Sequence, residues 1–167
     1  MLKPYQQLTA VRYFTAPIRD DPAALSRQQL YRNALGAHSR LLEIRKGRFQ
    51  RKSKRCFSCR SSWFEYEEKE SDVALGAAMV ADGARRLFGA AMIVSADSDM
   101  ASAVRELQCL RPGVRVIAAF PPNRNSSELK RVCDAFISIG DAKIRQAQLP
   151  ETVWADGHAI SRPDHWK

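Results

Sequence analysis

The sequence predicts an α/β fold with a mostly parallel sheet and helices on both of its faces. Segments rich in β-branched and aromatic residues alternate along the chain with segments whose apolar residues have helical spacing. The segments between successive strands are long enough to hold a crossover helix, which a pair of parallel strands requires. With 167 residues, 45% of them hydrophobic, the chain is long enough to bury the core of one globular domain.

The N-terminal part predicts a strand, a helix and a second strand. Residues 10–15 are rich in β-branched and aromatic side chains and predict the first strand. Asp21 precedes a proline and predicts a helix start, because its carboxylate can accept orphan N–H groups of the first turn. We expect this helix to end at Gly36. Residues 41–44 predict the second strand.

The middle of the chain predicts a helix, a buried strand and another helix. Residues 72–88 have helical spacing of apolar residues, with an acid in the first turn, where the helix dipole favours it. Residues 90–95 form a short apolar run, typical of a strand buried on both faces. A helix over residues 100–110 follows and is closed by a Pro-Gly pair. The apolar stripe predicted for the first of these helices is Val73, Ala77, Val80, Ala84 and Leu87.

The C-terminal part adds two strands and a short helix. Residues 114–120 predict a second buried strand, and residues 135–139 predict the last strand. Between them, Asn125 with Glu128 resembles a capping box that opens a helix.

The charge of the chain favours a polyanionic partner, most commonly nucleic acid. The formal net charge is +9 and the isoelectric point is near 9.8. Eight basic residues and no acidic residue fall within residues 45–60, so we expect this segment to form a loop or hairpin that projects from the body. Within it, Arg51, Lys52, Lys54 and Arg55 are the candidate nucleic-acid contacts.

Nothing in the sequence indicates export or membrane insertion. It has no apolar run of membrane-spanning length, and its N-terminus lacks the apolar centre of a secretory signal, so we expect a cytoplasmic location and no membrane partner. The four cysteines are too few and too unevenly spaced for a disulfide framework, and we expect them reduced. Cys109 and Cys133 are predicted to be small core residues.

Aspartates follow the predicted strand at residues 90–95. Asp97 and Asp99 lie at its carboxyl end, the edge at which open α/β sheets bind ligands. Asp72 opens the preceding helix, so three carboxylates converge if the connecting loop is short. Such a group suits a hard cation, Mg²⁺ or Mn²⁺. On spacing alone two other interpretations stay open: Ser98 or Asp99 caps the following helix, and Asp72 is a solvated first-turn acid.

Two motifs around these acids resemble bacterial NYN-domain proteins in order and spacing. The resemblance runs from about Val11 to Leu149. It also includes the segments at residues 119–122 and 126–129. The motifs that carry it are Glu67-Glu68-Lys69-x-x-Asp72-Val73 and Ser95-x-Asp97-Ser98-Asp99.

NYN domains are PIN-like, Rossmann-like domains of a metal-dependent ribonuclease superfamily. The resemblance implies that Asp72, Asp97 and Asp99 are the catalytic, metal-binding acids. It also implies that Ser95 and Ser98 shape the loop or contact a metal-bound water or phosphate. Further candidates for substrate contact are Lys69 and Ser126.

The sequence departs from the family at its start. The family's fold begins with a strand that ends in an aspartate, and the sequence has no counterpart of this strand. Because the strand is central in PIN-like sheets, we expect its absence to leave two half-sheets with unpaired edges. The predicted domain is therefore residues 1–150, N-terminally incomplete, with residues 151–167 as a C-terminal tail that has no clear periodicity. We expect weak cleavage or none, because fewer carboxylates hold the metal loosely.

Two features lie beside the basic segment. Cys56 and Cys59 have the spacing of half a zinc site, and a homodimer that shares two such pairs is the best way to complete it. Trp63, Phe64 and Tyr66 either stack on bases or anchor the loop.

Together these features predict a metal-dependent endoribonuclease that hydrolyses phosphodiester bonds of single-stranded RNA. A cation held by carboxylates activates a water, and the basic segment draws in the RNA strand. The alternative is a catalytically weak or inactive nucleic-acid-binding module of the same fold. A small-molecule enzyme of Rossmann type ranks last, because the sequence has no glycine-rich phosphate loop.

Overall fold

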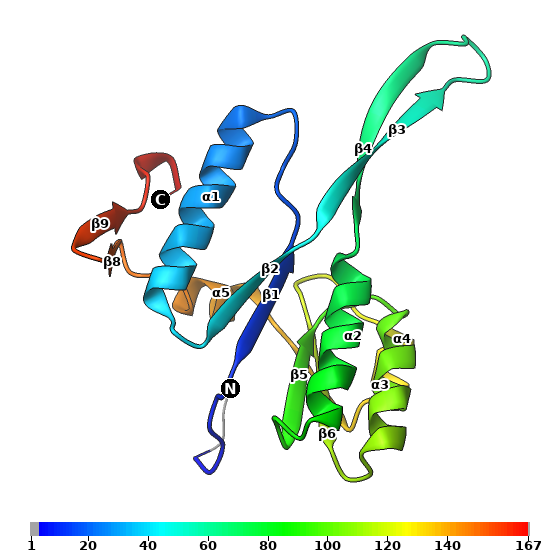
Figure 1. Cartoon of the computed structure of the whole chain (residues 1–167), viewed down its shortest axis with the longest axis vertical. Helices are drawn as coiled ribbons and strands as arrows, with labels where there is room; N and C mark the ends of the chain where they lie inside the picture. The colour runs from blue at the N-terminus through cyan, green and yellow to red at the C-terminus, as the bar shows by residue number, and fades with distance from the viewer. Residues whose placement is uncertain (1–3, 167) are drawn as a thin grey trace. The chain divides into compact units, whose positions relative to one another are not determined.

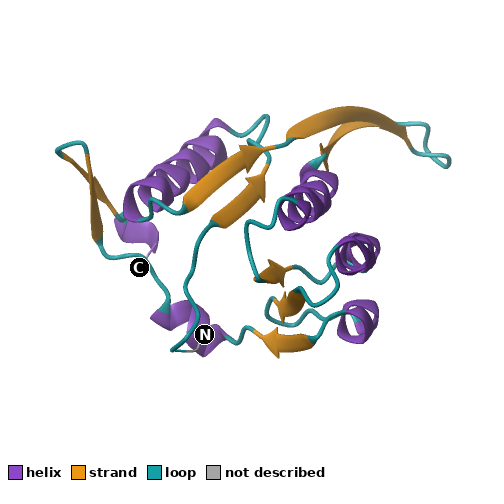
Figure 2. Ribbon diagram, turned by 60° about the horizontal axis from the view of Figure 1, so that its bottom comes forward, coloured by secondary structure: helices purple, strands orange, loops and turns teal. Residues whose placement is uncertain are grey.

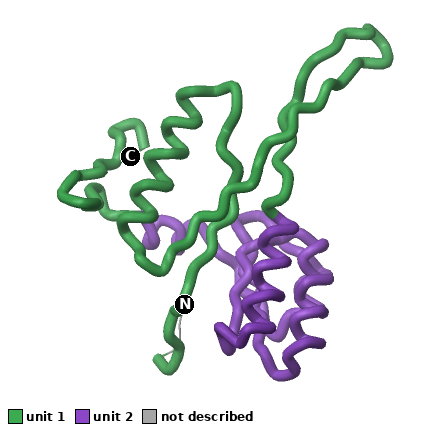
Figure 3. Tube along the Cα trace, viewed as in Figure 1, with its two compact units in different colours: residues 1–71, 149–167 green, residues 72–148 purple. Residues whose placement is uncertain are grey.

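The computed structural model describes residues 4–166, which form two compact units (Figures 1 and 3). Unit 1 comprises residues 1–71 and 149–167, and unit 2 comprises residues 72–148. The elements of unit 1 are β1 (Val11–Thr15), α1 (Pro22–His38), β2 (Leu42–Lys46), β3 (Arg48–Arg55), β4 (Ser62–Lys69), β8 (Thr152–Ala155), β9 (His158–Ser161) and a 3-10 helix, η1 (Asp164–Trp166). Those of unit 2 are α2 (Ser71–Ala84), β5 (Ala90–Val94), α3 (Met100–Leu110), β6 (Arg115–Phe120), α4 (Ser127–Val132), β7 (Ala135–Ser138) and α5 (Asp141–Gln146).

In unit 1, α1 connects β1 to β2, and the two strands form a parallel pair. The Asp21 carboxylate accepts a hydrogen bond from the Ala24 N–H at 2.9 Å, so the predicted helix start is confirmed. The predicted stop at Gly36 is wrong, because the helix continues to His38 and the backbone becomes extended at Ser39. A glycine inside a helix costs only about 1 kcal/mol, which the rest of this long helix offsets.

Most of the basic segment forms β3 and the tip of a long antiparallel hairpin, β3–β4, which extends away from the rest of unit 1 (Figure 1). Its first two residues, Arg45 and Lys46, end β2. The register places Arg48 opposite Lys69 and Arg55 opposite Ser62. The prediction of a projecting hairpin is confirmed. Nearly all of its side chains are exposed, so cross-strand pairs rather than a core hold it together.

The C-terminal tail, which has no clear periodicity in the sequence, forms a hairpin. β8 and β9 make an antiparallel hairpin that packs on α1. Asp156 and Gly157 connect the strands, with φ angles of 47° and 81°. Both angles are positive, as a two-residue type I′ turn requires, and Asp-Gly is the favoured pair there. The Asp156-Gly157 dipeptide therefore predicts this turn from the sequence.

Unit 2 has a three-stranded parallel sheet in the order β5-β6-β7. α2 and α3 lie along one face of this sheet (Figure 2). The predicted strands at residues 114–120 and 135–139 are confirmed as β6 and β7. The core of the unit lies between the helices and the central strand β6, and its largest fully buried side chains are Phe120, Leu107, Leu129, Val104 and Val116.

The buried face of α2 differs from the predicted stripe. Val73 is exposed, and so are Ala77, Ala84 and Leu87. The buried face instead includes Gly76, Met79 and Gly83. A Cβ atom on Gly83 would overlap a methyl carbon of Leu107, so the glycine leaves the space that this buried side chain occupies. Because most of its residues are small, such a face does not form a stripe of large apolar side chains in the sequence.

The end of α2 also differs from the prediction. The helix ends at Ala84 rather than at residue 88. The Arg86 N–H donates to the Gly83 carbonyl at 2.9 Å, and the Leu87 N–H donates to the Asp82 carbonyl at 3.1 Å. This is the Schellman arrangement, with Arg86 in the left-handed region at φ 59°. Glycine usually occupies that position, so the sequence carries no clear stop signal here.

β5 is an edge strand of its sheet among the described residues, not a strand buried on both faces as predicted. Met92 and Val94 are 41% and 58% exposed, whereas Ile93 between them is buried in the core. Successive side chains of a strand point to opposite faces. One face of β5 is therefore packed and the other is exposed within unit 2, so the expectation of helices on both sheet faces fails there.

The parallel strands of the described chain form two separate sheets, β1–β2 and β5–β6–β7. The absence of the family's first strand stays a prediction. No helix within residues 4–166 is both long and apolar enough to cross a membrane.

The two cysteines predicted for the core have different surroundings. Cys133 is half-buried and packs against the core of unit 2, and burial raises the pKa of its thiol. Cys109 is exposed, so the prediction is wrong for this residue. Its neighbour on α3, Leu107, occupies the buried side of the helix instead.

Candidate functional site

The acid motif forms the loop between β5 and α3, at the carboxyl end of β5. Ser95 Oγ accepts a hydrogen bond from the Asp97 N–H at 3.1 Å. Asp97 Oδ1 in turn accepts one from the Asp99 N–H at 2.9 Å. The motif's own side chains therefore hold the loop in shape, and the predicted loop-shaping role fits the geometry of Ser95.

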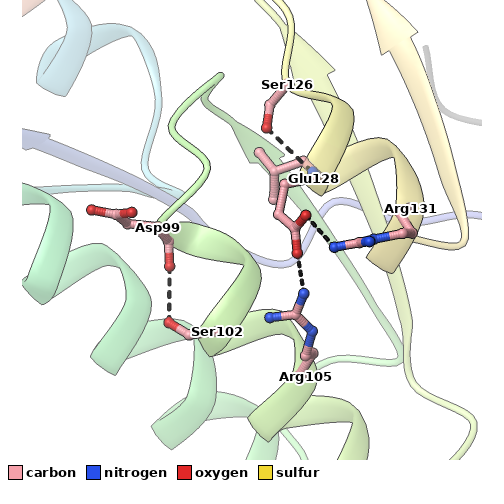
Figure 4. Close-up of polar contacts among 7 residues, drawn as sticks. Asp99, Ser102, Arg105, Ser126, Glu128 and Arg131 are labelled. Carbon is pink, nitrogen blue, oxygen red and sulfur yellow. Dashed lines mark hydrogen bonds and ion pairs between the residues drawn. The ribbon is translucent and has the colours of Figure 1, made fainter.

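Asp99 occupies the position before the first residue of α3, but its side chain makes no capping hydrogen bond. Its backbone carbonyl accepts from the Ser102 hydroxyl at 2.8 Å, and Figure 4 shows the Asp99 carboxylate directed away from this contact. The Ser98 carbonyl accepts the Ala101 N–H at 3.0 Å. The interpretation that the Ser98 or Asp99 side chain caps α3 is therefore wrong, and the local acceptor is Asp97.

The third predicted acid, Asp72, lies in the first turn of α2 and is exposed. Within residues 4–166, no three His, Cys, Asp or Glu side chains gather closely enough to hold a metal ion together. The loop thus brings Asp97 and Asp99 together in one short segment. The convergence of Asp72 with them stays a prediction.

Ser126 is buried and caps α4. Its Oγ accepts a hydrogen bond from the Leu129 N–H at 3.2 Å, so the cap is Ser126 and not the predicted Asn125. Glu128, the predicted partner in a capping box, forms ion pairs instead (Figure 4). Hydrogen bonds from Arg131 and Arg105 lower the pKa of its carboxyl. A substrate contact by Ser126 stays a prediction.

The cations of the hairpin face acids that lie beyond the basic segment in the sequence. Lys52 forms an ion pair with Glu67, and Lys54 forms one with Glu65. The hydrogen bond between Lys52 and Glu67 raises the pKa of the lysine and lowers that of the glutamate. The third lysine, Lys69, is 3.1 Å from the same Glu67. The hairpin surface therefore carries less net positive charge than the residues of the basic segment alone suggest.

Two arginines of the hairpin differ from its lysines. The guanidinium carbon of Arg51 lies 3.4 Å from the centroid of the Phe64 ring, a cation–π contact. Arg55 is exposed and lies opposite Ser62, so no acid faces it in the register. Trp63 and Phe64 are half exposed. The β3–β4 hairpin therefore combines cations with accessible aromatic rings.

The donor set of the acid loop fits a hard divalent cation. Asp97 and Asp99 supply two carboxylates from one loop, and Ser95 and Ser98 add hydroxyl groups. Mg²⁺ is commonly bound through one or two carboxylates, with waters and substrate phosphate completing its shell. The loop can serve as such a site without a third protein carboxylate.

Comparisons with known proteins agree with this α/β architecture. A solved structure of a protein of unknown function from Vibrio parahaemolyticus has a TM-score of 0.53 to this chain at 20% identity, covering 79% of this chain and 69% of that one. At this identity the likeness concerns the fold alone. No curated protein matches the chain. The model of the NYN domain family matches residues 3–140, well over half of the sequence, and the chain therefore belongs to the NYN domain family, a ribonuclease-like family.

Proposed function

We propose that this protein is a metal-dependent ribonuclease that hydrolyses phosphodiester bonds within single-stranded RNA. The observation that carries the proposal is the acid loop between β5 and α3. It presents two carboxylates at the carboxyl end of a parallel strand, and the Asp99 carboxylate is not used to cap the helix. In a chain of a ribonuclease-like family, Asp97 and Asp99 are the best supported ligands of Mg²⁺ or Mn²⁺.

In this proposal the loop positions its own ligands. Ser95 holds the backbone of Asp97, and Asp97 holds the backbone of Asp99. A shape fixed before the ion binds reduces the ordering that binding requires. Bound there, a divalent cation supplies a water of lowered pKa as the nucleophile and offsets charge on the phosphate.

The remaining candidates have assigned roles in the proposal. Asp72 is the third acid, on the basis of the family resemblance. On the same resemblance, Ser98 contacts a phosphate or a metal-bound water, and Lys69 and Ser126 contact the RNA. The RNA contacts in the β3–β4 hairpin are Arg51, Lys52, Lys54 and Arg55.

The choice of single-stranded RNA rests on the composition of the hairpin. Trp63 and Phe64 are half exposed, and unpaired bases stack on aromatic rings of this kind. The neighbouring cations attract the phosphates. Stacking is worth roughly 1–3 kcal/mol per base, which a duplex with its bases buried in the stack does not gain.

The test is cleavage of a single-stranded RNA by the purified chain over a series of Mg²⁺ and Mn²⁺ concentrations. Asp97→Asn and Asp99→Asn remove a ligand charge and keep the size of the side chain. Cleavage by the parent chain should be weak. Each variant should reduce it about a hundredfold or more, since the metal's stabilisation is worth several kcal/mol and about 1.4 kcal/mol is a factor of ten. The fold should survive, because the amide that replaces the Asp97 carboxylate keeps an accepting oxygen and Asp99 has no capping bond to lose.

The matched control is Asp156→Asn, which removes the same charge from the β8–β9 turn. Asparagine tolerates the positive φ of that position. Cleavage by this variant should equal that of the parent. If all three variants cleave alike, the acid loop is not the catalytic site.

A second candidate function is RNA binding without cleavage. The observation in its favour is that residues 4–166 contain no group of three metal-binding side chains. This module would bind RNA with a normal salt dependence, would not cleave it at any Mg²⁺ or Mn²⁺ concentration, and would bind equally well as the Asp97→Asn variant.

A further inference from the structure

The loop at the tip of the β3–β4 hairpin carries two cysteines on one turn. The Cys59 sulfur lies 2.9 Å from the Ser61 hydroxyl oxygen. Both cysteines are free; Cys59 is exposed and Cys56 is partly exposed. The tip therefore presents two reduced thiols on a single exposed turn.

The backbone of this tip is ordered by its own hydrogen bonds. The Cys56 N–H donates to the Ser61 carbonyl at 2.8 Å, and the Arg60 N–H donates to the Cys56 carbonyl at 3.0 Å. Arg60 adopts φ 57°, in the left-handed region. These contacts place both sulfurs on one turn without any help from a bound ion. The turn has thus already lost its conformational entropy before a ligand binds.

Metal binding at this turn requires ionised cysteines. The thiolate is the form that binds metal ions, and each thiol that binds must first lose its proton.

Two thiolates are only half of a structural zinc site. Zn²⁺ takes four ligands in such sites, often two pairs with this spacing. No third ligand joins the two cysteines within the described part of the chain, since no group of three metal-binding side chains occurs there. The missing ligands must come from another molecule, and a second copy of this chain carries an identical pair.

We propose that Cys56 and Cys59 bind Zn²⁺ together with the same two cysteines of a second copy, so that the ion joins two hairpin tips. Four thiols lose four protons to solvent as four zinc–sulfur bonds form, and no electron is transferred. The product carries a formal charge of −2, and Arg55 and Arg60 of both copies lie beside the cysteines in sequence to offset it. Phe57, between the two cysteines, is fully exposed and becomes covered when two tips meet.

The experiment is a titration of the reduced full-length chain with Co²⁺ and then Zn²⁺, with the absorption spectrum and the sedimentation coefficient recorded together. The expected result is a four-thiolate Co²⁺ spectrum that saturates at half an ion per chain, with conversion of monomer to dimer at the same point. Zn²⁺ should displace Co²⁺, and a chelator should restore the monomer. The affinity should fall as the pH is lowered, because protons compete with the ion for the thiolates.

Cys59→Ser and Cys56→Ser should each abolish the spectrum and the dimer, while Cys109→Ser, an exposed cysteine on α3, should change neither. The tip has no part in a core, so circular dichroism should show all three variants folded. One ion per monomer, no ion at all, or unchanged binding by Cys59→Ser would each overturn the proposal.

Discussion

The core of unit 2 and the β3–β4 hairpin are stabilised in opposite ways. In unit 2, Leu107, Val116 and Phe120 are completely buried between the helices and the central strand. In the hairpin nearly every side chain is exposed, and its contacts include ion pairs and a cation–π contact. Core packing is worth several kcal/mol per large side chain, whereas exposed ion pairs contribute about 1 kcal/mol or less.

This difference in packing agrees with the function proposed for each region. A metal ligand must be held within a fraction of an ångström, and the acid loop joins two elements of the packed core. A hairpin that binds a flexible RNA strand needs accessible charge and exposed rings rather than a fixed interior. Four predictions test this contrast, in order of decreasing effect.

The largest effect should come from truncating the core of unit 2. Leu107→Ala removes a fully buried side chain from α3 and should reduce the free energy of unfolding by about 2–5 kcal/mol. Leu110→Ala on the same helix is the control, because that side chain is 52% exposed and its loss should cost only about 0.5 kcal/mol. Urea unfolding followed by circular dichroism measures both. Equal losses would mean that the packing of α3 is not the main source of stability.

The second effect concerns RNA binding. Replacing four cations of the hairpin by serine should lower the affinity for single-stranded RNA on the order of a hundredfold at 0.15 M salt. Each lost phosphate contact should reduce the log–log salt slope by about 0.7. The four residues are Arg51, Lys52, Lys54 and Arg55.

Its control removes four positive charges from unit 2 instead. Serine replaces four exposed residues there, Arg85, Arg124, Lys143 and Arg145. An affinity and a salt slope that fall as much in this control as in the hairpin variant would show that net charge, not the hairpin, governs binding.

A smaller effect should separate two glycines in helices. Gly83→Ala places a Cβ against a methyl group of buried Leu107 and should cost about 1–3 kcal/mol. Gly36→Ala in α1 meets nothing within 4 Å and should stabilise the chain by about 0.5–1 kcal/mol. The double variant of Gly83→Ala with Leu107→Ala should lose less than the sum, since the two changes share one space. Strict additivity in unfolding experiments would contradict the contact between Gly83 and Leu107.

The smallest effect should follow removal of the hairpin acids. Changing Glu65 and Glu67 to glutamine frees Lys52 and Lys54 for phosphates, so RNA binding should strengthen a few-fold and become more sensitive to salt. The unfolding midpoint should hardly move. Glutamines in place of Glu106 and Glu151 provide the control of equal charge. Unchanged RNA affinity in the hairpin variant would show that its lysines do not contact RNA.

The pH dependence of the hairpin has a defined sign. Because the Lys52 hydrogen bond lowers the pKa of Glu67 below its ordinary value of 4.5, the stability that this pair adds is fully present above that pH. It is lost as the pH falls through the lower, folded-state pKa.

Local features of the chain were predictable from the sequence alone. The cap at Asp21, the strands β6 and β7 and the projecting hairpin follow from short-range rules of capping, apolar runs and charge. The acid motif also stands at the strand end where the sequence placed it. The turn at Asp156 and Gly157 carried a signal of the same local kind that was overlooked.

Tertiary structure decided what these local rules cannot reach. Whether Val94 is covered depends on which strand lies beside β5, and whether α2 packs through Gly83 depends on how close Leu107 comes. The cations of β3 meet the acids of β4 only after the strands pair. The composition of residues 45–60 alone therefore does not show that Lys52 has an acidic partner, Glu67. The sequence by itself determines where many helices, strands and turns form, because capping and turns involve neighbours in sequence. Exposure and net local charge depend instead on residues distant in sequence, and only folding brings these together.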